Sequence, residues 1–159
     1  MSITVGILTE IKNYLARKIP DFEVELMPNS PNDYFLSHPL GAVLISYVGS
    51  SFDNSRPTSL RVQTRNLQIA LTVMTRDLHN EQGALELLDN LRSAILGFAP
   101  KNCEPCWILK EQYGGNDEDT GVWIYELIIA TTTQQVEKKE ARDLPRFVEA
   151  LIKNKQQGE

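Results

Sequence analysis

The chain has 159 residues, of which 42% are hydrophobic and 23% are charged, and its formal net charge at pH 7 is −5. This length favours one domain that buries its core without disulfides or metal ions. An acidic chain with no basic block is a poor candidate for binding nucleic acid, and no apolar run reaches the roughly 18–20 residues that span a bilayer. The first residues also lack the basic segment of a signal peptide, so we expect a cytoplasmic protein in which disulfides are uncommon.

The first half of the chain predicts a helix followed by three strands. Apolar residues recur at helical spacing from Ile3 to Ile19, after Ser2 as N-cap and before Pro20, which cannot continue a helix. Three strand patterns follow: an alternation of apolar and acidic residues, a continuous β-prone run typical of a strand covered on both faces, and a long alternation with one apolar face. These strands are predicted over residues 21–28, 42–50 and 60–76.

The second half predicts a helix, a hairpin and a last helix. A stripe of Ala and Leu at helical spacing follows Asn80, the predicted N-cap, and Gly97 suits the left-handed position that ends many helices. Two β-prone runs then flank a loop rich in Gly and Asp, which is a hairpin signal. The helices are predicted over residues 80–97 and 144–155, and the strands over residues 107–113 and 121–135.

The order of these elements does not alternate strictly between strands and helices. It therefore indicates an α+β fold, with a mainly antiparallel sheet of about five strands, two helices packed on one face and an additional C-terminal helix. We expect residues 1–140 to form this α+β domain and residues 141–159 to form a C-terminal helical extension with a polar tail.

The only two cysteines, Cys103 and Cys106, form the sequence CEPC, which has the spacing of a redox or metal-binding motif. In thioredoxin-like proteins such a pair precedes a helix, whose N-terminus lowers the pKa of the first thiol, but here the pair follows the predicted helix. A structural zinc site needs four ligands, and His38 and His79 stand alone in separate loops. We therefore interpret the cysteines as loop residues and expect no catalytic residue, cofactor or metal site.

Two groups of charged residues are candidate contacts with a protein partner. They are Arg56, Arg61, Arg65, Asp117, Glu118 and Asp119. The three arginines stand in a polar segment of an acidic chain, where contact with an acidic surface is the alternative to plain solvation. The three acidic residues stand in the predicted hairpin loop, whose spacing does not match an EF-hand. A solvated hairpin tip is the simplest interpretation there, and contact with a basic partner is the alternative.

After the predicted N-terminal helix and first strand, four segments follow in order: GAVLISYVGSSF, VQTRNLQIALTVMTR, GALELLDNLRSAILGFAP and YGGNDEDTGVWIYELIIAT. This ordered series, over roughly residues 3–135, resembles the small tail proteins of Mu-like phages and prophages, which are regarded as tail terminators. The Gly-Val-Trp-x-Tyr opening of the last strand is the most specific part. The segment after residue 135 lies outside the resemblance, and we expect it to be particular to this protein.

The resemblance implies a structural role without catalysis. Proteins of this kind have an α/β fold and assemble as a ring, usually homohexameric, that caps the tail tube, stops its polymerisation and joins the tail to the head. The implied partners are further copies of the chain, the tube protein, and the sheath and head–tail connector proteins. The implied location is the host bacterial cytoplasm during assembly and then the virion tail.

A ring needs two different patches on each copy, so we expect Arg61 or Arg65 of one copy to face residues 117–119 of the next. Three other functions remain open. The chain is alternatively another neck or tail-completion protein, a thiol oxidoreductase that uses Cys103 and Cys106, or a ligand-binding α+β domain without a phage role.

Overall fold

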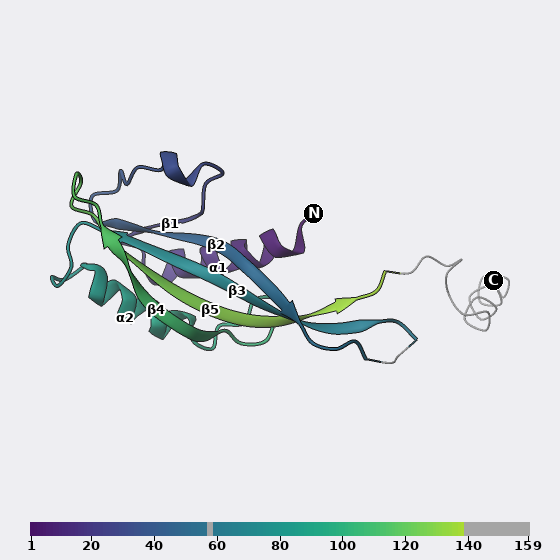
Figure 1. Cartoon of the computed structure of the whole chain (residues 1–159). Coiled ribbons are helices and arrows are strands. Elements are labelled where there is room, and N and C mark those ends of the chain that lie inside the picture. The colour runs from purple at the N-terminus through teal and green to yellow at the C-terminus, as the bar shows by residue number, and fades with distance from the viewer. Residues whose placement is uncertain (57–58, 139–159) are drawn as a thin grey trace, which may run out of the picture.

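A computed structural model describes residues 1–56 and 59–138 (Figure 1). Within these residues it confirms the predicted order of helices and strands. The elements are α1 (Ile3–Lys18), β1 (Glu23–Leu26), a short 3-10 helix η1 (Pro31–Asp33), β2 (Gly41–Phe52), β3 (Val62–Thr75), α2 (Ala84–Ile95), β4 (Trp107–Asn116) and β5 (Trp123–Val136). The helix predicted over residues 144–155 and the boundary predicted at residues 140 and 141 lie outside the described residues.

The strands form one five-stranded sheet in the order β1-β2-β3-β5-β4. The pairs β2–β3, β3–β5 and β4–β5 are antiparallel, as predicted, whereas β1 runs parallel to β2. The fold is therefore α+β with a mixed, mostly antiparallel sheet. Among the described residues, no helix has the length and apolar character needed to cross a membrane.

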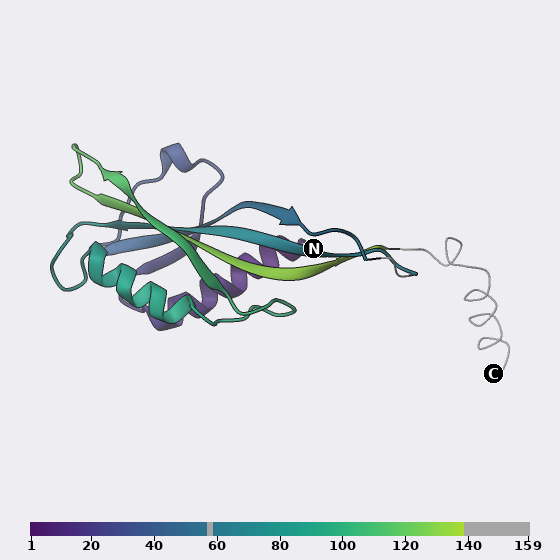
Figure 2. The same ribbon diagram turned by 60° about the horizontal axis from the view of Figure 1, so that its bottom comes forward.

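The hydrophobic core lies between the sheet and the two helices (Figure 2). Helix α1 contacts β1 and β2, and α2 contacts β3 and β5. The Tyr14 hydroxyl donates a hydrogen bond to the Ala94 carbonyl at 2.8 Å, which joins the two helices. The alternation predicted for β3 is confirmed, because Leu67, Ile69, Leu71 and Val73 are all buried in this core.

The prediction that β2 is covered on both faces is correct only for its first half. Ala42 to Ile45 are buried, but Tyr47 and Val48 are exposed. β1 pairs with β2 only as far as Ile45, so the second half of β2 has no strand on that side in the described part of the chain. The apolar run alone did not indicate at which residue the side chains of β2 cease to be buried.

The predicted N-cap of the second helix is wrong. Helix α2 begins at Ala84 with Gly83 as its N-cap, because Asn80 belongs to a turn in which its carbonyl accepts a hydrogen bond from the Gly83 N–H. A Cβ at Gly83 would lie 2.8 Å from the carbonyl oxygens of Leu78 and Asn80, so this turn requires glycine. At the other end, Gly97 has the predicted left-handed conformation, with φ +89°.

The sheet continues past the start of α1 as a narrow three-stranded extension, which we call the β arm (Figures 1 and 2). It consists of the ends of β2 and β5, the beginning of β3, and the loop between β2 and β3. Its strand segments are residues 47–52, 62–66 and 131–136, held together by the β2–β3 and β3–β5 ladders. Of these strand residues only Thr131 is buried, so a larger share of the residues is exposed in the arm than in the helix-covered body.

Candidate interaction surfaces

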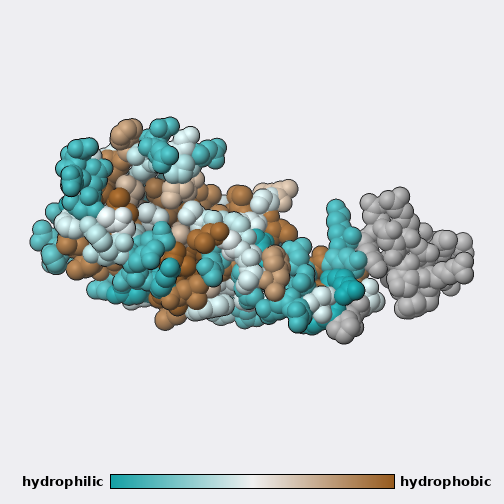
Figure 3. Space-filling view, viewed as in Figure 1, coloured by the Kyte–Doolittle hydropathy of each residue, from teal (hydrophilic) through white to brown (hydrophobic). Residues whose placement is uncertain are grey.

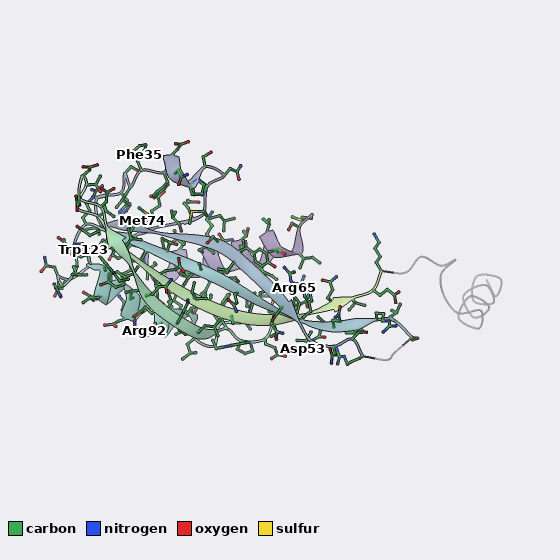
Figure 4. All side chains as sticks on the ribbon, viewed as in Figure 1. Phe35, Asp53, Arg65, Met74, Arg92 and Trp123 are labelled. Atoms are coloured by element: carbon green, nitrogen blue, oxygen red, sulfur yellow. The ribbon has the colours of Figure 1, made fainter. Side chains whose placement is uncertain are left out.

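The six candidate contact residues lie at opposite ends of the molecule. The three arginines belong to the β arm, and the acidic residues at 117–119, here called the acidic loop, join β4 to β5 at the far end (Figures 1 and 4). The structure does not bring the two groups together within one chain. A contact between the two groups would therefore have to join two separate copies of the chain.

Arg65 bonds within its own chain. Its Nε donates to Ser50 Oγ at 3.0 Å, and its Nη2 donates to Thr4 Oγ1 at 2.8 Å and to Tyr47 Oη at 3.2 Å. The guanidinium also lies 5.5 Å from the centre of the Tyr47 ring. Hydrogen bonds from Ser50 and then Arg65 lower the pKa of the Tyr47 hydroxyl. Arg65 therefore connects the root of the β arm to the start of α1.

Arg56 and Arg61 are exposed near the tip of the β arm. Arg56 Nη2 donates to Gln134 Oε1 at 2.7 Å, and Arg61 Nη1 donates to Ser55 Oγ at 3.1 Å. The ion pairs Lys12–Glu25, Arg92–Asp89 and Arg92–Glu111 lie in the body. Hydroxyl and amide oxygens bond the two guanidinium groups, while Glu137 Oε2 accepts a hydrogen bond from the Arg61 N–H at 3.0 Å, so the arm tip carries charges of both signs.

The acidic loop is shaped by one of its own carboxylates. Asp117 Oδ1 accepts hydrogen bonds from the N–H groups of Asp119 at 2.9 Å and Thr120 at 3.4 Å. This is an Asx turn, in which the side chain replaces a backbone acceptor. Glu118 and Asp119 remain exposed. Across residues 1–56 and 59–138, no cluster of three or more His, Cys, Asp or Glu is placed to hold a metal ion.

The two cysteines are free thiols in different surroundings. Cys103 lies in the loop before β4, as predicted, whereas the side chain of Cys106 is 2% exposed and belongs to the core. Burial raises the pKa of both thiols, and burial together with the charge of Cys103 raises the pKa of Cys106 to about 11. Both thiols are therefore protonated at neutral pH, which works against thiolate chemistry.

A small hollow lies between the loop after β1, the end of β3 and the beginning of β5. It has a volume of about 100 Å³ and is lined by residues that include Phe35, Met74 and Ile124. Figure 4 shows Phe35 on the loop above this end of the sheet. Ligand pockets usually have volumes of about 300–1,000 Å³, which this hollow does not reach. Two hollows of about 340 Å³ beside the start of α1 and about 420 Å³ between α1 and α2 do reach that range.

The edge strand β4 and the second half of β2, with which β1 does not pair, expose apolar side chains that the sequence did not identify as contact residues. They are Tyr47, Val48 and Phe52 on β2, and Trp107, Leu109 and Tyr113 on β4. Figure 3 shows hydrophobic residues at the surface of the body, in the region of β4. The sequence placed these residues on strands, and aromatic residues on strands most often lie in the core. Only the strand order identifies them as edge residues.

The fold and these surfaces define a small α+β domain with a protruding β arm. Residues 11–152 match the family model described as "Gp37 protein". The chain belongs to this Gp37 family, a family of phage proteins. Comparison with curated proteins gives no match. The matched region includes residues 136–152, so it does not support our expectation that the segment after residue 135 is particular to this protein.

Proposed function

We propose that the chain is a tail terminator, which forms a homohexameric ring on the tail tube, stops its polymerisation and joins the tail to the head. The observation that carries the proposal is the β arm. In a chain of a phage protein family, three strands extend past the helices and end in exposed basic and apolar side chains. A ring needs two different patches on each copy, and the arm, which projects from the body, offers one of them.

The partners follow from this position in the particle. The ring binds further copies of the chain on its sides and the tube protein on one face. In a contractile tail it also meets the sheath, and its opposite face meets the head–tail connector proteins. The chain acts in the host bacterial cytoplasm during assembly and stays in the virion tail.

Two features favour this structural role over the thiol oxidoreductase. The family is a family of phage proteins, which favours a structural protein over an enzyme. The raised pKa values of Cys103 and Cys106 also keep both thiols protonated at neutral pH. A reactive cysteine normally has a lowered pKa, set by a nearby positive charge or a helix N-terminus.

Deletion of the gene from its phage or prophage, followed by electron microscopy of the particles, tests the proposal. A terminator predicts overlong tails without heads, and the wild-type gene supplied in trans should restore normal length. Headless tails of normal length would identify the other neck or tail-completion function. Complete particles with normal tails would contradict both.

A further inference from the structure

We propose that neighbouring copies join edge to edge: β2 in the arm of one copy pairs with β4 of the next copy as antiparallel strands. The sheets of the two copies then form one continuous sheet. This inference rests on the proposed function in one respect, because it presupposes that the copies assemble as a ring.

The first open edge is the second half of β2. β1 pairs with Ala42 to Ile45, and the last bond on that side runs from the Met27 N–H to the Ile45 carbonyl at 2.8 Å. Beyond Ile45, nothing in the described part of the chain pairs with that edge. The Asp53 N–H donates to the Thr64 carbonyl across the β2–β3 ladder. Since backbone groups alternate in direction along a strand, Phe52 points its N–H away from β3, toward the open side.

The second open edge is β4, the last strand in the sheet order. Near its beginning, the Gly97 N–H donates to the Cys106 carbonyl and the Cys106 N–H donates to the Phe98 carbonyl. Gly97 and Phe98 therefore pair only with Cys106, immediately before β4 begins at Trp107. From there the strand runs to Asn116 with its outer side unpaired in the described residues.

Both open edges expose large apolar side chains. In the described residues, 13 large hydrophobic side chains are exposed, and the three on β2 together with the three on β4 make up nearly half of them. Edge strands of monomeric proteins are usually short, charged or interrupted by proline, because an open edge can pair with another chain. β4 carries Lys110 and two register shifts, yet it also exposes Trp107, Leu109 and Tyr113. These exposed apolar side chains fit an edge strand that another copy covers on assembly.

The strand directions fit a head-to-tail ring. Within one copy, β4 is antiparallel to β5, β5 to β3, and β3 to β2, so β4 runs antiparallel to β2. A neighbour that keeps the same strand direction therefore brings its β4 to β2 in the antiparallel sense, like the other long pairs of the sheet. Because β1 occupies β2 as far as Ile45, β4 of the neighbour is displaced toward the arm tip.

This pairing changes the expected charge contact. The end of β2 meets the beginning of β4 in an antiparallel pair, so the arm tip with Arg56 approaches exposed Glu104 of the next copy. The acidic loop follows the far end of β4 and lies away from the arm tip. The contact between Arg61 or Arg65 and the acidic loop, expected from charge alone, is not part of this interface.

Photo-cross-linking of the full chain tests the pairing directly. Benzoylphenylalanine replaces Phe52, which is 51% exposed, and the cross-linked peptides are identified by mass spectrometry from concentrated protein and from assembled tails. We expect cross-links between chains that end within residues 104–113. The same group at Phe35, which is 82% exposed and lies beside the acidic loop, is the control and should not mark residues 104–113 of another chain.

Each outcome decides the inference without deciding the function. Cross-links from position 52 to the acidic loop, cross-links within one chain only, or no cross-links at all would overturn strand pairing, even if gene deletion gives overlong tails. Cross-links to β4 would uphold strand pairing even if tail length proved normal after deletion.

A pair of substitutions separates backbone pairing from side-chain contact. Phe52→Pro removes an N–H that points away from β3, whereas Phe52→Ala removes the same side chain and keeps the N–H. In sedimentation, we expect Phe52→Pro to abolish assembly, and we expect the loss of assembly in Phe52→Ala to be at least tenfold smaller. Circular dichroism should show that both variants remain folded. An equal loss in both variants would assign the contact to the side chain and contradict strand pairing.

Discussion

The helix-covered half of the sheet and the β arm are made from the same three strands, but they are stabilised in different ways. In the body, the inner face of β3 carries Leu67, Ile69 and Leu71, which are 0% exposed. In the arm, residues 62–66 of the same strand are half-buried, and most of them are polar. Hydrophobic burial is the main stabilising contribution in the body, while hydrogen bonds hold the arm.

The hydrogen bonds of the arm link its strands to one another. Gln63 donates to the Asp53 carbonyl at 3.0 Å, and Asn66 donates to Asp53 Oδ1 at 3.0 Å. Net contributions of such bonds are only about 0.5–1.5 kcal/mol each, because water competes for the same groups. Substitutions in the body should therefore change stability, whereas substitutions in the arm should change assembly more than stability.

Leu71→Ala should have the largest effect on stability. Leu71 is 0% exposed at the centre of the core, so its truncation leaves a cavity and should cost about 2–5 kcal/mol. The measurement is the free energy of unfolding in urea. Val62→Ala in the arm is the matched control and should cost less than about 1 kcal/mol, because Val62 is half-buried. Similar losses in both variants would remove the distinction between body and arm.

Arg65→Lys should have the next largest effect. Lysine keeps the charge but cannot bond Thr4, Ser50 and Tyr47 together, so the root of the arm should loosen, at a cost of about 1–2 kcal/mol for these partly exposed bonds. Hydrogen exchange should become faster in the arm and at the start of α1. Arg56→Lys is the control, because its bond to Gln134 lies within the arm. Unchanged exchange in Arg65→Lys would show that Arg65 does not hold the arm.

The two cysteines lie in different regions. The backbone of Cys103 forms an isolated β-bridge with Thr133 at the root of the arm, whereas Cys106 is buried in the body. A rise of the Cys106 pKa from 9.0 to about 11 lowers its thiolate fraction at neutral pH about a hundredfold. At pH 8, a thiol reagent should therefore modify Cys103 first, as mass spectrometry of timed samples will show. Faster modification of Cys106 would contradict its burial.

The same pKa sets the sign of a pH dependence. Folding raises the pKa of Cys106, so its contribution to stability is fully present below pH 9 and should be lost as the pH rises toward 11. Cys106→Ala should flatten this part of the stability curve relative to wild type, measured by thermal unfolding. The double variant Cys103→Ser/Cys106→Ala should still support tail assembly. Loss of assembly in a folded double variant would favour thiol chemistry.

The order of helices and strands was predictable because each element has its own periodicity. The apolar alternation of β3 and the stripe of α2 are local patterns, and they are visible without knowledge of their partners. The parallel pairing of β1 with β2 was not predictable in this way. It depends on where the chain goes between the two strands, which no local pattern states.

The residues of the interaction surfaces were harder to predict. Arg65 was selected for its charge, but its bond to Thr4 joins residues 61 positions apart in sequence. Tyr47 and Val48 belong to an apolar run that looks like core, yet both are exposed in the half of β2 with which β1 does not pair. The sequence shows which side chains are charged or apolar, but the arrangement of the strands is needed to tell which of them are exposed.

Charge reversal at the surface should have the smallest effect on stability and still distinguish two interfaces. Glu104 and Asp119 are both exposed, so Glu104→Arg and Asp119→Arg should each change the free energy of unfolding by less than about 0.5 kcal/mol. If the arm tip meets the beginning of β4, Glu104→Arg should weaken assembly by about tenfold at low salt, and Arg56→Glu in the same chain should restore it. Asp119→Arg should leave assembly unchanged. The opposite result, with assembly sensitive to Asp119 and indifferent to Glu104, would place the arm against the acidic loop and replace edge pairing with the contact that charge alone suggested.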